Sequence, residues 1–135
     1  MSKKVVVLST SLRSNSNSEL LAKSFVEGAK ESGNEVEYIS LKNKDIRFCN
    51  GCLTCQKTGH CVIKDDVAGI MDSVLYADVV VWATPIYYYE MSGQIKLLLI
   101  VSIQCILKII SLEMYIFLRQ LQKKETKSLK KLLLD

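Results

Sequence analysis

Four of the five cysteines in this 135-residue chain lie within one short polar stretch, at the spacing C-x2-C-x2-C-x5-C. Four thiolates at this spacing can surround a cubane iron–sulfur cluster. Zinc is less suited, because structural zinc sites usually combine two pairs of ligands across a longer insert. The alternative is a loop of reduced thiols that holds no metal. The candidate metal ligands are Cys49, Cys52, Cys55 and Cys61.

A second polar segment, residues 9–18, directly follows the apolar run at residues 5–8. It contains neither the GxGxxG nor the GxxxxGK[ST] pattern. Its hydroxyl, amide and guanidinium groups, together with the free N–H groups of a following helix, suit the three oxygens of a terminal phosphomonoester. On composition alone a solvated Ser/Asn-rich loop explains the segment equally well. The position directly after the first strand favours phosphate.

Three consecutive tyrosines, Tyr87, Tyr88 and Tyr89, occur shortly after another apolar run, residues 79–83. Their rings and hydroxyl groups suit stacking against a flat polar heterocycle, and we also expect at least one ring to pack inward as part of the core. A phosphate site beside an aromatic surface indicates a mononucleotide with a ring system. Flavin mononucleotide (FMN) fits both ends.

The elements that position these segments alternate between strands and helices. Residues 5–8 and 79–83 have the continuous apolar pattern of strands buried on both faces, and residues 36–39 suggest a strand between them. Residues 42–64, which contain the cysteines, are predicted to be irregular. Strands that alternate with helices imply right-handed crossovers and an open parallel sheet.

Two helices are predicted between these strands. The first has apolar residues at helical spacing over residues 20–28, with Asn17 or Ser18 as its N-cap and Gly33 as its end. The second extends to about residue 76, with Asp65 or Asp66 as its cap.

Composition indicates one globular domain, because 49% of the residues are hydrophobic and 24% are charged. Residues 1–99 contain eleven Lys/Arg and eleven Asp/Glu, so the net charge of +4 arises entirely in residues 100–135. We therefore expect no nucleic-acid partner. The N-terminal residues do not resemble a signal peptide, so we expect a cytoplasmic protein.

The segments STSLRSNSNS and ATPIYYYEMSGQIK, in this order and spacing, resemble the NADPH-dependent FMN reductase family, near its iron–sulfur flavoprotein branch. The resemblance covers roughly residues 3–99. It implies a flavodoxin-like, doubly wound parallel sheet in a three-layer α/β/α arrangement, truncated after the third strand and the following helix. It also assigns cofactor-binding residues. Those for the FMN phosphate are Ser11, Arg13, Ser16, Asn17 and Ser18, and those for the isoalloxazine are Pro85, Ile86, Tyr87 and Tyr88. Ser9 completes the candidate set.

The implied activity is transfer of hydride from NAD(P)H through FMN to a small-molecule electron acceptor or redox protein, in a homo-oligomer. No catalytic side chain is assigned, because the flavin carries the chemistry. His60, the only histidine, is interpreted as an exposed loop residue. The first alternative is an electron carrier with FMN and a [4Fe–4S] cluster. The second is a truncated remnant with little function.

From about residue 100 the sequence departs from the family pattern, which would continue with Asp-Arg and then Asn-Pro. Permitted codons for residues 100–126, preceded by one added G, encode DRFNPMYSKDYKFRDVYFLATAAEEGD, which resembles the family's own continuation. One lost nucleotide therefore explains a division into an incomplete FMN-binding domain, residues 1–99, and a tail, residues 100–135. Two central charges in the apolar part of the tail, Lys108 and Glu113, argue against a membrane span. Residues 112–118 are apolar enough to imitate a fourth strand.

Overall fold

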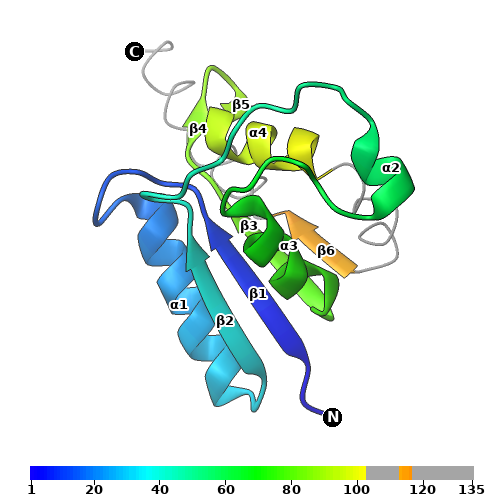
Figure 1. The fold of residues 1–135 in the computed structure, drawn as a ribbon. Helices are drawn as coiled ribbons and strands as arrows, with labels where there is room; N and C mark the ends of the chain where they lie inside the picture. The colour runs from blue at the N-terminus through cyan, green and yellow to red at the C-terminus, as the bar shows by residue number, and fades with distance from the viewer. Residues whose placement is uncertain (103–112, 117–135) are drawn as a thin grey trace, which may run out of the picture.

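The computed structural model describes residues 1–102 and 113–116. Its main sheet has four parallel strands in the order β2-β1-β3-β6 (Figure 1). Over β2, β1 and β3 this is the flavodoxin-like order that was predicted, and β6, a segment of the tail, takes the fourth position. The strands are β1 (Lys4–Ser9), β2 (Glu35–Ser40), β3 (Val79–Ala83) and β6 (Glu113–Ile116).

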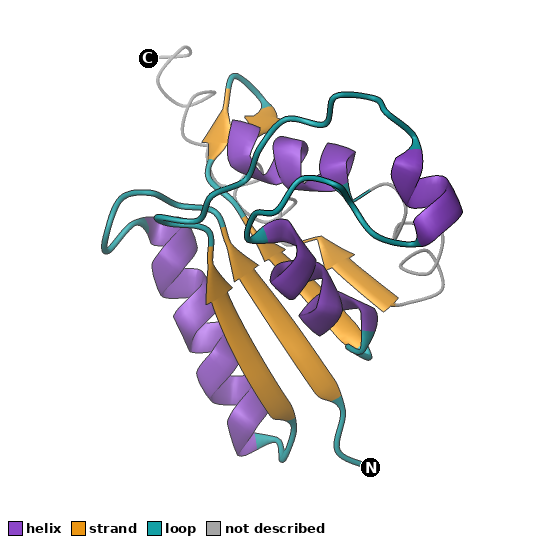
Figure 2. Ribbon diagram, in the orientation of Figure 1, coloured by secondary structure: helices purple, strands orange, loops and turns teal. Residues whose placement is uncertain are grey.

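Helices cover both faces of the sheet, which gives the three-layer arrangement (Figure 2). Helix α1 (Asn17–Glu31) lies on one face, and α3 (Val67–Leu75) and α4 (Gly93–Val101) lie on the other. A short helix, α2 (Thr54–Thr58), interrupts the segment that was predicted to be irregular throughout.

The core explains why β1 and β3 have continuous apolar sequences. Alternate side chains of these strands point to opposite faces, so each strand must be apolar at every position to be buried on both sides. Val7 and Val81 pack in the cluster that includes Ala22 of α1. Val6 and Val80 pack in the cluster that includes Val74 of α3 and residues of α4.

Helix α1 begins slightly earlier than predicted, with Ser16 as its N-cap. Ser16 has an extended backbone, and its hydroxyl accepts the Glu19 amide at 3.2 Å. The prediction of Gly33 as the end of the helix is confirmed. Its φ of +80° and the bond from its amide to the Lys30 carbonyl, 2.9 Å, form a glycine-terminated C-cap.

The fourth position of the sheet is occupied by β6, which pairs with residues 79–82 of β3. The prediction that part of the tail imitates a fourth strand is therefore confirmed for residues 113–116. Predictions for residues 103–112 and 117–135 lie outside the described residues. In the described part of the chain, no helix is long and apolar enough to cross a membrane.

Candidate functional site

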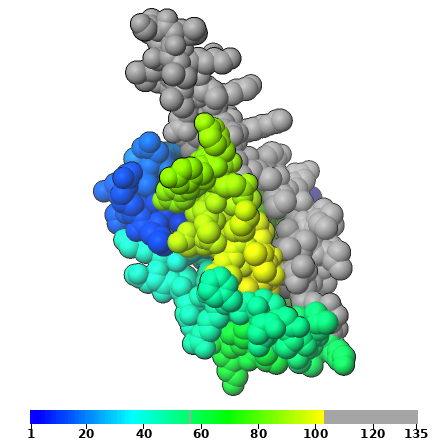
Figure 3. Space-filling view, turned by 90° about the horizontal axis from the view of Figure 1, so that it is seen from above, coloured from blue at the N-terminus to red at the C-terminus, as the bar shows by residue number. Residues whose placement is uncertain are grey.

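Two loops meet at the carboxyl end of the sheet, the serine loop (residues 10–16) after β1 and the tyrosine hairpin (residues 86–91) after β3. The Thr10 amide donates to the Ala83 carbonyl at 2.9 Å. The Ser92 hydroxyl donates to Thr10 Oγ1 at 2.9 Å, and the Ser92 amide donates to Thr84 Oγ1 at 3.1 Å. Thr10, Thr84 and Ser92 are all buried. This network fixes the two loops side by side, as the space-filling view shows (Figure 3).

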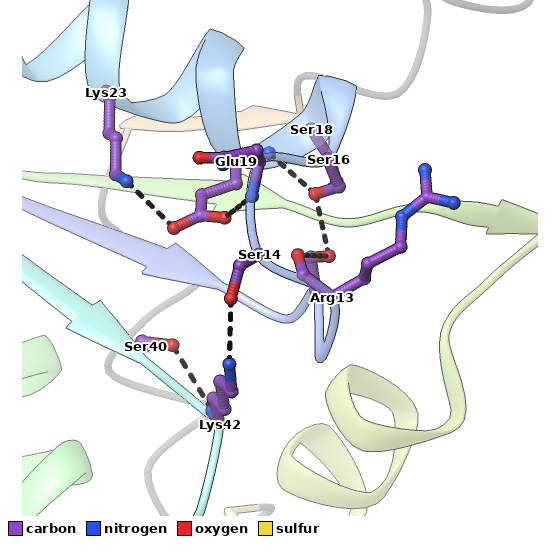
Figure 4. A network of polar contacts seen from close by, with 10 residues as sticks. Arg13, Ser14, Ser16, Ser18, Glu19, Lys23, Ser40 and Lys42 are labelled. Atoms are coloured by element: carbon purple, nitrogen blue, oxygen red, sulfur yellow. Dashed lines mark hydrogen bonds and ion pairs between the residues drawn. The ribbon is translucent and has the colours of Figure 1, made fainter.

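Three buried serine hydroxyls gather where the serine loop enters α1 (Figure 4). Ser16 Oγ donates to Ser11 Oγ at 2.7 Å and lies 3.3 Å from Ser18 Oγ. Ser11 Oγ in turn donates to the Arg13 carbonyl at 3.0 Å. The structure thus brings together three of the residues that the resemblance assigns to phosphate, and their role in binding stays a prediction.

Several donors at this corner have no acceptor within the part of the chain that the structure describes. They include the amides of Asn17 and Ser18 at the start of α1 and the guanidinium of Arg13, which extends into solvent (Figure 4). The buried Ser9 hydroxyl also has no partner there. Ser9 lies in register with Ser40 of β2 and Ala83 of β3. Unpaired donors at a helix N-terminus suit a bound anion.

Sequence reasoning missed two charged residues of this corner. Lys42, which follows β2, donates from Nζ to Ser14 Oγ at 2.9 Å. Glu19 pairs with Lys23 at 2.9 Å and accepts the Asn15 amide at 2.8 Å, and these two hydrogen bonds hold the pKa of Glu19 below its ordinary value. The available signal for Lys42 was its position, since carboxyl ends of neighbouring parallel strands share one edge of the sheet.

The tyrosine hairpin consists of β4 (Ile86–Tyr87) and β5 (Glu90–Met91), joined by Tyr88 and Tyr89. These two residues have φ of +49° and +64°, so the turn has positive φ at both central positions. Asn-Gly ordinarily occupies such a turn, because a bulky side chain is strained there. This strain is of the kind that clusters at functional sites.

The expectation that one tyrosine ring packs inward is wrong. Tyr87, Tyr88 and Tyr89 are 62%, 99% and 79% exposed. The hairpin explains this result, because Tyr88 and Tyr89 form its turn, which projects beyond the main sheet (Figure 1). Pro85 and Ile86 are half-buried. The rings are therefore available to a ligand beside the serine loop.

The four cysteines lie in the cysteine loop (residues 45–66), whose base is closed by hydrogen bonds. The Asp45 amide donates to Asp66 Oδ2 at 2.8 Å, and the Asp66 amide donates to the Asp45 carbonyl at 3.0 Å. The Arg47 amide donates to Asp65 Oδ2 at 3.0 Å. This closure ties the loop to the start of α3. Of the two predicted caps, Asp66 occupies the N-cap position without a side-chain cap bond, and Asp65 Oδ1 accepts the Val67 amide at 3.1 Å. In Figure 3, α4 lies between the tyrosine hairpin and the cysteine loop.

The hydrogen bonds around the cysteines suit metal-binding thiolates, but the positions of the four sulfur atoms do not form a metal site. The Gly51 amide donates to Cys49 Sγ and the Ile63 amide to Cys61 Sγ, each at 3.4 Å. Of the four thiols, Cys52 has a pKa held below its ordinary value, by hydrogen bonds from the side chain and the backbone of Thr54. Within residues 1–102 and 113–116, however, no three His, Cys, Asp or Glu side chains are grouped so as to hold a metal ion. All four thiols are free, and His60 is exposed, as predicted.

The strand order and the two loops beyond β1 and β3 define a flavodoxin-like α/β protein. Residues 3–100 match the family described as NADPH-dependent FMN reductase. The chain belongs to this family.

Among its relatives is an iron-sulfur flavoprotein of Methanocaldococcus jannaschii. The two sequences are 36% identical over 96 residues, and the matched region covers 71% of this chain and 50% of that protein. The fold is similar to that of the NAD(P)H:quinone oxidoreductase from Methanothermobacter marburgensis, with a TM-score of 0.60 and 20% identity over 72% of this chain and 51% of the other. The fold is also similar to that of a flavoenzyme NAD(P)H:(acceptor) oxidoreductase from Paracoccus denitrificans. The TM-score is 0.53 and the sequence identity is 26%, over 72% of this chain and 48% of the other. The chain spans about half the length of these relatives.

Proposed function

We propose that this chain forms the FMN-binding part of an NAD(P)H-dependent oxidoreductase that passes hydride to a small-molecule acceptor or a redox protein. The observation that carries the proposal is the buried serine cluster at the start of α1, held against an exposed aromatic hairpin by Thr10 and Ser92. One loop suits the phosphate and the other suits the ring. Bound FMN would accept hydride from the nicotinamide and pass the electrons on to the acceptor.

At the phosphate end, binding needs hydrogen-bond donors. The first amides of α1, those of Asn17 and Ser18, offer N–H groups that have no acceptor within the described residues. The hydroxyls of Ser11 and Ser18 would turn to the phosphate from their present acceptors, the Arg13 carbonyl and Ser16 Oγ. Arg13 adds a charged donor at the rim, which suits the charge of a phosphomonoester. Ser16 maintains the cluster, because its hydroxyl bonds both Ser11 and the Glu19 amide.

At the ring end, the residues orient the flavin and exclude water. Pro85 and Ile86 supply a half-buried apolar surface, and Tyr87 and Tyr88 supply exposed rings. Offset stacking against an aromatic ring contributes about 0.5–1.5 kcal/mol beyond the area buried. No side chain is assigned as an acid or base, because bound flavin would supply the redox chemistry itself.

The test is a titration of the purified chain with FMN and with riboflavin, followed by oxidation of NADPH or NADH in the presence of a quinone. We expect Ser18→Ala to weaken FMN binding about threefold to tenfold and to leave riboflavin binding unchanged, because riboflavin lacks the phosphate. Ser24→Ala, on the exposed part of the same helix, is the matched control. Equal weakening of FMN and riboflavin by Ser18→Ala would exclude this phosphate site.

A second candidate is an electron carrier that holds FMN and a [4Fe–4S] cluster. The lowered pKa of the Cys52 thiol favours it, as do the iron-sulfur flavoprotein names of several relatives. The four thiols are not grouped around one point within the described residues. Binding of a cluster would therefore require the cysteine loop to change conformation between the hydrogen-bonded residues Asp45 and Asp66. We expect anaerobic reconstitution with iron and sulfide to give a broad absorption that dithionite bleaches. Cys52→Ser should abolish it and Cys105→Ser should not.

The remaining expectations are a homo-oligomer, a cytoplasmic location and a division of the chain at about residue 100. Light scattering after size exclusion tests the first, with and without FMN. A colourless protein that cannot be reconstituted with FMN would instead favour a truncated remnant. Resequencing the coding DNA tests the lost nucleotide, and an intact frame with codons unlike those inferred would exclude it.

A further inference from the structure

Lys42 is held at the serine loop by the backbone of its own strand end. The preceding residue, Leu41, is buried, and its amide donates to the Ser9 carbonyl at 2.8 Å. The Lys42 amide donates to Ser40 Oγ at 3.2 Å. These bonds fix the start of the Lys42 side chain next to the end of β1. Its proximity to the serine loop therefore follows from the pairing of β2 with β1.

The ammonium of Lys42 is unusual among the cations of the described residues that have a fixed polar contact. Lys23, Lys44, Arg47 and Lys96 each form an ion pair with a carboxylate. Lys42 instead donates to the neutral hydroxyl of Ser14, and within residues 1–102 and 113–116 no carboxylate lies within ion-pair distance of it. An ammonium has three donors, so two remain for another acceptor.

The charges around the serine loop balance a phosphomonoester. Glu19 is the acidic residue at the start of α1, and Lys23 matches its charge at 2.9 Å. This leaves Arg13 and Lys42 as cations that form no ion pair within the described residues, and the Glu19 carboxylate also attracts Lys42 over a longer distance. A phosphomonoester carries a charge of about −1.5 to −2 at pH 7. Two cations and the N-terminus of α1 are sufficient to neutralise it.

We propose that Lys42 is a second phosphate-binding cation of this site and makes it selective for phosphorylated flavin. This inference rests on the proposed function. In this arrangement, Lys42 keeps its bond to Ser14 and donates a second hydrogen to an oxygen of the same phosphate that the N-terminus of α1 binds. The loops after β1 and β2 then bind one anion together, which neither loop's sequence indicates alone.

The experiment compares FMN with riboflavin in the full chain and in three variants. Lys42→Gln should weaken FMN binding about tenfold to a hundredfold, as expected for a charge-assisted hydrogen bond, and leave riboflavin binding unchanged. It should also lower the salt dependence of FMN binding. Lys42→Arg should restore most of the affinity. Lys44→Gln, whose lysine is paired with Asp66, is the control and should bind FMN normally.

The outcomes separate the two proposals. If the unmodified chain prefers FMN to riboflavin but Lys42→Gln retains that preference, the role of Lys42 is wrong and the phosphate site stands. If the unmodified chain has no preference, the phosphate site itself is wrong. If Lys42→Gln changes discrimination between NADPH and NADH but not FMN affinity, the lysine binds the other phosphomonoester and the inference is overturned. Urea unfolding of each variant shows whether lost binding is lost folding.

Discussion

Replacement of Ser16 by alanine tests the central contact of the serine loop. Ser16 is the N-cap of α1, it accepts the Glu19 amide, and its buried hydroxyl donates to Ser11 Oγ at 2.7 Å. Loss of an N-cap serine costs about 1 kcal/mol. Loss of a buried hydroxyl hydrogen bond costs about 1 kcal/mol more. We therefore expect Ser16→Ala to lower the free energy of unfolding by about 2 kcal/mol.

The assay is equilibrium unfolding in urea, with Ser24→Ala as a control on the exposed face of the same helix. Ser24→Ala should leave stability unchanged or slightly increased, because alanine favours a helix more than serine does. Ser16→Ala should also reduce FMN affinity, since Ser11 and the first turn of α1 lose their fixed positions. A free energy of unfolding within about 0.5 kcal/mol of that of the unmodified chain would exclude a stabilising role for the Ser16 hydroxyl, because surface substitutions commonly give such values.

Three further predictions concern the neighbouring elements. The double substitution Tyr88→Asn/Tyr89→Gly should raise the free energy of unfolding by about 1–2 kcal/mol, because it removes two bulky side chains from positions with positive φ. The same substitution should weaken flavin binding. A lower free energy of unfolding in urea would contradict the prediction. Folding lowers the pKa of Glu19, so ionised Glu19 stabilises the folded state fully above its unfolded pKa, and this stabilisation is lost as the pH falls through the folded pKa. Glu19→Gln should therefore flatten the acid side of a plot of unfolding free energy against pH. A plot unchanged by the substitution would contradict this. Asp66→Ala should open the cysteine loop and speed limited proteolysis there about tenfold, whereas Asp72→Ala, on the exposed face of α3, should not.

The central strands could be predicted because their sequences allow one placement. In an unbroken apolar run such as residues 5–8 or 79–83, side chains on both faces of the strand are apolar, and exposing either face to water would cost stability. Such a strand therefore lies inside a sheet that helices cover on both faces. The end of α1 was equally clear, since Gly33 adopts a conformation that other residues avoid. Its start was not, because residues 14–18 are all Ser or Asn and each is a good N-cap. The hydrogen bond from the Glu19 amide selects Ser16.

The candidate site was predictable where it depends on local sequence and not where it depends on long-range pairing. The positions of the two loops follow from the ends of β1 and β3. The tyrosine hairpin was missed, because Tyr88 and Tyr89 occupy turn positions that intrinsic preferences assign to Asn and Gly. Lys42 was missed because its contact with Ser14 depends on the register of β2 against β1.

A paired equilibrium titration of the purified chain with FMN and riboflavin, at one ionic strength, measures directly whether the serine loop binds a phosphate. The buried serine cluster, Arg13 and Lys42 all contribute through the phosphate, so FMN should bind at least about tenfold more tightly than riboflavin. Equal affinities, or no binding of either flavin, would contradict the assignment of the serine loop as a phosphate site.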